Sequence, residues 1–189
     1  MHNLGYKIMN ENFAQELESL KQRVETLEQG NKDQISIVVF SGELDKHLAA
    51  FVIATGAAAM GTKAKLFFSF WATAALRDKK KKVKGKNFIS KMFGMMLPKG
   101  TTKLKLSKMH MMGMGKSMMK GLMKKKNVAS LEEMLKTAAE NEIEINICEM
   151  SMHLMGFTKE EMIDYPHMNI CGVASFLEDA SESKVQLFI

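Results

Sequence analysis

Cysteine and proline are scarce in this chain, which contains two of each among 189 residues. The cysteines, Cys148 and Cys171, lie far apart in the sequence, and neither belongs to the Cys-x-x-Cys pattern of zinc and redox sites. The five histidines are scattered. The sequence therefore excludes a disulfide scaffold and predicts no metal site, and it fits a reducing compartment such as the cytoplasm.

Long apolar stretches are also lacking. The longest covers residues 48–60 and is rich in small side chains, whereas roughly 20 apolar residues are needed to cross a bilayer. The first residues have neither the basic region nor the apolar region of a secretory signal. We expect a cytoplasmic protein in which residues 48–60 form a buried helix.

Nucleotide-binding and hydrolytic motifs are missing as well. There is no P-loop, no Rossmann glycine fingerprint and no Ser/His/Asp order in the sequence. We therefore expect no cofactor. A flavin remains an open alternative, because flavodoxin-like sites hold it with ordinary loop residues.

Methionine and lysine, by contrast, are abundant. The chain has 19 methionines and a net charge of +6. Lysine fills six of the eight positions 79–86, which we interpret as a solvated loop; nucleic acid is not an expected partner, because no aromatic residues interleave with these lysines. Ten methionines follow within residues 88–123: Met92, Met95, Met96, Met109, Met111, Met112, Met114, Met118, Met119 and Met123.

The methionine-rich part of this Met/Lys-rich insertion (about residues 79–126) covers residues 88–123 and has three interpretations. Methionine is flexible and polarisable and suits adaptable apolar surfaces, so the segment is either helical packing filled by methionine, or a mobile lid or docking surface over the site. A soft-metal site is the third, since thioethers can bind copper(I), but the methionine spacing follows no ligand pattern.

The N-terminal residues 1–32 are predicted to form a separate amphipathic helix. Apolar residues follow a heptad seam over residues 10–29, and Gly30 ends the pattern. Two heptads are too short for a stable coiled coil alone. Self-association and docking on the same subunit both remain open. The seam consists of Phe13, Leu17, Leu20, Val24 and Leu27.

Residues 33–189 alternate between strand and helix patterns. Strands are predicted at 35–40, 64–70, 143–148 and 185–189, and a capping box at Ser130 and Glu133 begins a helix to about residue 141. This alternation predicts an α/β fold with a mainly parallel sheet of four or five strands and helices on both faces. Sites in such sheets lie beyond the carboxyl ends of the strands.

Cys148 lies where one strand should end and a helix should begin. Free backbone N–H groups and the helix dipole at such a position favour a thiolate, although a buried structural thiol is the default interpretation of a cysteine. Cys171 precedes Gly172 at a second expected helix start, and nearby thiols can form a transient disulfide. His47 and His153 lie near the expected site loops, as thiolate-forming partners or as ordinary histidines. The other candidate site residues are Ser41, Gly42, Trp71, Met150, Ser151, Met152 and His153.

Several stretches together resemble one known family. They are residues 40–46 (FSGELDK), 67–71 (FFSFW), 108–115 (KMHMMGMG), 148–156 (CEMSMHLMG) and 171–177 (CGVASFL). Over about residues 34–189 the chain is similar to the DsrE/DsrF/DsrH-like family, in its methionine-rich, peroxiredoxin-like branch of DsrE2 type. No peroxidatic Thr-x-x-Cys arrangement is present.

This resemblance implies a flavodoxin-like fold, a homo-oligomer and sulfur handling through a cysteine persulfide. The sulfur-carrying cysteine of the family matches Cys148, and Cys171 is matched less firmly. The implied partners are a rhodanese-type donor and a TusA-like acceptor, with catalysis as a sulfurtransferase or carriage alone left open. Two alternatives are a docking or membrane-surface module built on the Met/Lys-rich segment, and a flavin or thiol-disulfide redox protein.

Overall fold

The computed structural model describes residues 12–25, 32–81, 83 and 88–189. The chain divides into two compact units, Met1–Lys32 and Asp33–Ile189. Residues 12–25 are helical, and the four residues of the predicted seam in this range are all exposed. Leu27 and Gly30, at the predicted end of this helix, lie outside the described residues.

Five strands in the described part of the second unit form one sheet, in the order β4-β3-β2-β1-β5. The pairs β1–β2, β2–β3 and β3–β4 are parallel. β5 extends β1 in the same direction, since Ile189 donates its N–H to the Val38 carbonyl and accepts from the Phe40 N–H. The predicted α/β fold is confirmed. The strands are β1 (Lys32–Val39), β2 (Lys63–Phe68), β3 (Glu144–Cys148), β4 (Met168–Cys171) and β5 (Ser183–Phe188).

One face of the sheet carries the main core. Side chains at alternate strand positions, such as Ile37, Leu66 and Ile145, are fully buried there. They lie under α2 (Leu44–Ala59) and α5 (Leu131–Glu140), which pack side by side. The capping box predicted at the start of α5 is present, with Ser130 accepting from the Glu133 N–H and the Glu133 carboxylate accepting from the Ser130 N–H.

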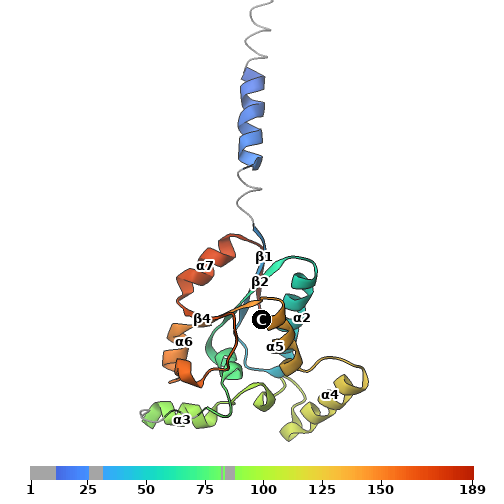
Figure 1. The fold of residues 1–189 in the computed structure, drawn as a ribbon, viewed down its shortest axis with the longest axis vertical. Helices are drawn as coiled ribbons and strands as arrows, with labels where there is room; N and C mark the ends of the chain where they lie inside the picture. The colour runs from blue at the N-terminus through green and yellow to red at the C-terminus, as the bar shows by residue number, and fades with distance from the viewer. Residues whose placement is uncertain (1–11, 26–31, 82, 84–87) are drawn as a thin grey trace, which may run out of the picture. The chain divides into compact units, whose positions relative to one another are not determined.

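The opposite face lies under α7 (Val173–Ser181). From β1 to β4 each new strand is added on one side of β1, whereas β5 pairs on the other side of β1. Because crossovers between parallel strands are right-handed, a connection that runs back across the sheet in this way places its helix on the second face. Figure 1 shows α7 on the far side of the strands from α2 and α5. Beneath α7, Val38, Phe67 and Cys148 form a small second cluster with Phe176.

Helical segments connect β2 to β3. They are η1 (Phe70–Leu76), α3 (Phe88–Met96), η2 (Thr101–Lys103), η3 (Met111–Gly113) and α4 (Met114–Lys125). α3 and α4 lie on opposite sides of the same end of the domain, the end away from α7 (Figure 1). No helix in the described ranges is long and apolar enough to cross a bilayer.

The methionine-rich helices expose much of their apolar surface. Along α3 the exposed positions are Phe88, Met92, Met95 and Met96, and along α4 they are Met114, Met118 and Leu122. Their spacing of three or four residues puts each set on one face of its helix. The interpretation of this segment as core packing is therefore wrong for these side chains.

A local prediction near the C-terminus needs correction. In this region α6 (Glu149–Leu154) is followed by the short 3-10 turn η4 (Lys159–Glu161). Cys171 does not begin a helix: it ends β4, and α7 begins at Val173. β4 escaped prediction because it is four residues long and its side chains are mostly half-buried, so it has no apolar run.

Candidate functional site

The two cysteines lie side by side at the carboxyl edge of the sheet. Cys148 ends β3, Cys171 ends β4, and they are register partners in the parallel β3–β4 ladder. Neighbouring strands are about 4.8 Å apart, and register partners project to the same face of the sheet. The positions therefore form a two-thiol site, although they are 23 residues apart in the sequence.

α7 covers this pair unequally. The Cys148 side chain is buried, with 4% of its surface exposed, whereas Cys171 is half-buried. Phe176 of α7 packs against Phe67 of β2 with ring centroids 5.1 Å apart, next to Cys148. Access from solvent is therefore through the Cys171 side of the pair.

The surroundings of Cys171 hold it in the protonated form. Burial raises the pKa of the Cys171 thiol most, and the nearby Cys148, Asp179 and Glu149 raise it further. The Ser175 hydroxyl acts in the opposite direction, because it donates a hydrogen bond that favours the thiolate. At neutral pH Cys171 is therefore predominantly a thiol.

α6 begins immediately after Cys148, as the sequence predicts for this position. The Cys148 side chain makes no capping hydrogen bond to the first turn of the helix, which is only six residues long. Ser151 of α6 is buried and its hydroxyl lies 2.9 Å from the Ser69 hydroxyl after β2. This bond joins α6 to the carboxyl end of the neighbouring strand.

A layer of polar groups, some of them buried and others partly exposed, anchors α7 over the sheet. Asp179 lies at its centre: Lys65 Nζ is 2.6 Å from Asp179 Oδ1, and Asn146 Nδ2 is 3.4 Å from Asp179 Oδ2. Gln34 donates to the Asp179 carbonyl at 3.0 Å, and Asn169 donates to Asn146 at 3.3 Å. Asp179 therefore holds α7 in place above the thiols.

The sequence alone did not identify Ser175, Phe176 or Asp179 as site residues. A signal was available in their spacing, because positions four and eight residues after Cys171 share one helix face once α7 is known to begin near Gly172. Without β4, however, nothing indicated that this helix lies over Cys148.

The other predicted site residues divide into separate groups. Gly42 and Trp71 are neighbours, since a Cβ atom at Gly42 would lie 3.1 Å from the Trp71 Cβ. Both line a cavity of about 630 Å³ that extends to residues 94–99 of the methionine-rich segment and contains neither cysteine. Ser41 donates its N–H to the Ile189 carbonyl at 3.3 Å.

Among the remaining predicted residues, Met152 is buried in the main core. Met150 and His153 are exposed. His47 is fully buried, with Nδ1 2.8 Å from the Glu43 carbonyl oxygen, and burial lowers its pKa. It is a core side chain with a partner.

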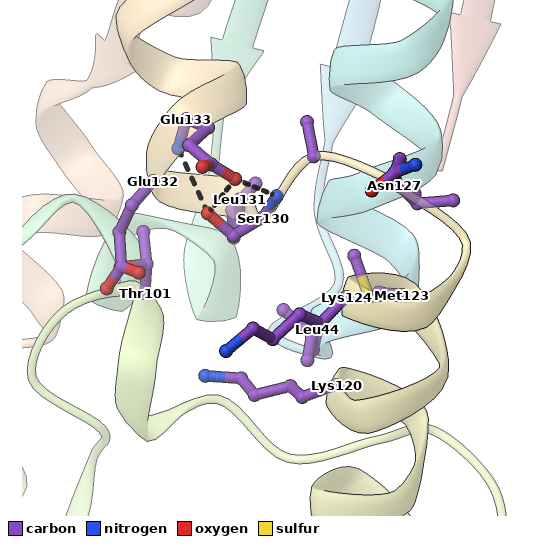
Figure 2. Close-up of a pocket in the computed structure, with 12 residues that line it drawn as sticks. Leu44, Thr101, Lys120, Met123, Lys124, Asn127, Ser130, Leu131, Glu132 and Glu133 are labelled. Carbon is purple, nitrogen blue, oxygen red and sulfur yellow. Dashed lines mark hydrogen bonds between the residues drawn. The ribbon is translucent and has the colours of Figure 1, made fainter.

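A second cavity, of about 590 Å³, lies between α4 and α5. Figure 2 shows Lys120 and Lys124 of α4 extending toward Thr101 and Ser130. The Ser130 hydroxyl is already used in the capping box. The described residues contain no group of three or more His, Cys, Asp or Glu side chains arranged to hold a metal ion.

Comparisons with known proteins place this geometry in context. The model of the DsrE/DsrF/DrsH-like family matches residues 31–188. The uncharacterized protein YrkE of Bacillus subtilis (strain 168) is 43% identical over 154 residues, which is 82% of this chain and 95% of that protein. The sulfur carrier protein DsrE2 of Allochromatium vinosum is 34% identical over 160 residues, or 82% and 98% of the two chains. The crystal structure of the ychN protein from E. coli matches with a TM-score of 0.48 and 10% identity, over 84% of this chain and 99% of that one.

Proposed function

This chain belongs to the DsrE/DsrF/DrsH-like family, and we propose that it carries sulfane sulfur as a persulfide on Cys148, with Cys171 as the second thiol of the site. The proposed donor is a rhodanese-type protein and the proposed acceptor a TusA-like carrier. We further propose that the protein works as a homo-oligomer. The relative from Allochromatium vinosum is named a sulfur carrier, which supports the same chemistry here.

The observation that carries this proposal is the register pairing of Cys148 with Cys171 at the carboxyl edge of the sheet. Ligand and reaction sites in open α/β sheets lie at this edge. The Cys148 thiol lies at this edge beneath α7, and α7 is anchored through Asp179. The thiol is therefore protected from water yet close to the surface. That combination suits a group that must hold a reactive sulfur atom between two transfers.

The transfer itself is thiol–persulfide exchange. The Cys148 thiolate attacks the outer sulfur of a donor persulfide, a new S–S bond forms on Cys148, and the donor leaves as a thiolate. An acceptor thiolate then attacks the outer sulfur on Cys148 in the same way, and Cys148 is restored. Both steps need access to a side chain that is 4% exposed, so partner docking must open the Cys171 side of the pair.

Intact-protein mass spectrometry tests the proposal. Wild type, Cys148→Ser and Cys171→Ser are incubated with polysulfide, or with thiosulfate and a rhodanese. We expect Cys171→Ser to gain sulfur and Cys148→Ser to gain none. Folded protein that takes up no sulfur in any of the three forms would contradict the carrier function, and uptake by Cys148→Ser alone would move the carrying thiol to Cys171.

A second candidate function, attachment to an anionic membrane surface, is favoured by one further observation. Residues 79–131 contain 16 of the 27 basic residues of the chain and none of its 21 acidic residues. The exposed apolar faces of α3 and α4 belong to this same segment. Interleaved lysines and exposed apolar side chains are the pattern of helices that lie on anionic bilayers. Sedimentation with lipid vesicles tests it, and is independent of Cys148.

A further inference from the structure

We propose that Cys171 is a resolving thiol, which displaces sulfide from the Cys148 persulfide and leaves a Cys148–Cys171 disulfide. This inference rests on the proposed persulfide and adds a second exit for the sulfur. When no acceptor is docked, the loaded protein releases hydrogen sulfide. An external thiol or dithiol reductant then restores the two cysteines.

The geometry allows the disulfide. Register partners on neighbouring strands have Cα atoms about 5 Å apart, within the range of about 4.4–6.8 Å that disulfides span. Both thiols are on the α7 face of the sheet, since Cys148 and Cys171 contact the same apolar cluster. Cys171 is also the last residue of its strand.

The two cysteines differ in how much of their surroundings is filled by protein. A Cβ atom placed on Gly172 would meet nothing within 4 Å, so the turn from β4 into α7 has open space beside it. Cys148, in contrast, is fixed between β3 and α6 and buried. Cys171 is therefore the more accessible partner of the pair, and Cys148 is the buried, protected one.

The step balances as written. The Cys171 thiolate attacks the inner sulfur of Cys148–S–SH, the Cys148–Cys171 S–S bond forms, and the bond to the outer sulfur breaks. The outer sulfur leaves as hydrosulfide with the electron pair of that bond. The two protein sulfurs are thereby oxidised to a disulfide, and the sulfane sulfur is reduced to sulfide.

The same surroundings keep this step slow near neutral pH. The groups around Cys171 are Cys148 of β3, Glu149 of α6, and Ser175 and Asp179 of α7, and among these only Ser175 favours the thiolate. Cys171 must lose its proton before it attacks. The persulfide is therefore lost by this step more slowly near neutral pH than at higher pH, where release of sulfide accelerates.

The experiment follows sulfide and protein mass together. Protein loaded with polysulfide is freed of excess reagent, kept without reductant and without acceptor, and sampled between about pH 7 and pH 9. For wild type we expect sulfide release, with loss of the added sulfur and of two hydrogens from the protein mass. The rate should rise about tenfold per pH unit below the pKa of Cys171, as its thiolate fraction does, and should not depend on protein concentration.

Two variants sharpen the test. Cys171→Ser should load sulfur and retain it at every pH. Ser175→Ala keeps both cysteines, and because it removes the hydrogen bond that favours the Cys171 thiolate, its rate profile should move to higher pH with the same final disulfide. A structural role for Ser175 alone would leave the pH profile of the folded protein unchanged.

The outcomes separate this inference from the proposed carrier function. Wild type that loads sulfur and keeps it as long as Cys171→Ser does would overturn the resolving role and leave the carrier intact. A failure of unloaded wild type to form an internal disulfide with diamide would overturn the pairing geometry. Absence of sulfur loading in every form would overturn the carrier function and the resolving step together.

Discussion

At the scale of single residues, the burial of His47 makes the stability of the protein depend on pH. Its ring is fully buried, packs 5.8 Å from the Phe68 ring and has a lowered pKa because burial disfavours the charged form. The unfolded chain therefore binds more protons than the folded one below the ordinary pKa of histidine, about 6.5. The contribution of neutral, buried His47 to the free energy of unfolding is therefore complete above that pH and decreases as the pH falls.

We expect the free energy of unfolding of wild type to fall between about pH 7 and pH 5, measured by urea denaturation. His47→Gln, although less stable overall, should lose the part of this dependence that belongs to His47. His153→Gln is the matched control, because His153 is exposed. An unchanged pH dependence in His47→Gln would show that His47 is not responsible.

Arg77 and Glu161 form a second residue-scale feature, a charge pair within the protein. Their side chains are 3% and 5% exposed, with Arg77 Nε 3.8 Å from Glu161 Oε2, and the guanidinium lies 4.3 Å from the Phe157 ring centre. Arg77 also donates to the Gly94 carbonyl at 3.2 Å. The Arg77–Glu161 pair therefore connects the end of η1 with η4 and α3.

Removing the charge of Glu161 leaves the buried guanidinium without its carboxylate. Glu161→Gln should therefore destabilise the protein by about 3–5 kcal/mol. Asp33→Asn breaks the exposed pair with Lys184 and should cost less than about 1 kcal/mol. Equal losses in the two variants, measured by denaturant unfolding, would contradict the importance of burial for this pair.

At the scale of elements, α7 limits the access of solvent and reagents to the Cys148 side chain. Its polar contacts with the sheet are concentrated at Asp179, which bonds Lys65 and Asn146. Asp179→Ala should loosen the helix and increase the rate of alkylation of Cys148 by iodoacetamide several-fold, as read by peptide mass spectrometry. Glu178→Ala changes the exposed neighbouring position and should leave that rate unaltered. If both variants protect Cys148 equally well, another contact holds α7.

Most of the strands could be predicted from the sequence, whereas β4 and the strand pairing could not. β1, β2, β3 and β5 were predicted because β-branched or alternating apolar residues mark them, and α5 because its capping box is local chemistry. β4 was missed because Met168-Asn169-Ile170-Cys171 is stabilised by pairing with β3 rather than by its own pattern. The position of Cys148 at a strand end followed from the alternation of elements. Its pairing with Cys171 did not, because register depends on contacts between distant segments.

At the scale of the whole molecule, charge is segregated. Residues 79–131 hold 16 lysines and no acidic residue, so the rest of the chain contains all 21 acidic residues and 11 basic ones. Charges of one sign gathered on one segment attract a surface of the opposite sign and are screened by salt. The exposed apolar stripe of α4, Met114, Met118 and Leu122, lies in the same segment.

We therefore expect the full chain to sediment with vesicles that contain phosphatidylglycerol, and weakly or not at all with pure phosphatidylcholine. Binding should fall at least about tenfold between 0.1 M and 1 M salt, since the screening length drops from about 10 Å to about 3 Å. Cys148→Ser should bind like wild type, because the thiol is buried beneath α7.

The apolar contribution is tested by Met118→Gln combined with Leu122→Gln, which should weaken vesicle binding. Val173→Gln combined with Leu177→Gln is the matched control, because these α7 side chains are each 59% exposed and lie outside the lysine-rich segment. Binding that is equal for charged and neutral vesicles would contradict the electrostatic argument. If vesicles bind neither form, while wild type self-associates in sedimentation velocity and the α4 variant does not, the α4 stripe belongs to an interface between copies of this chain.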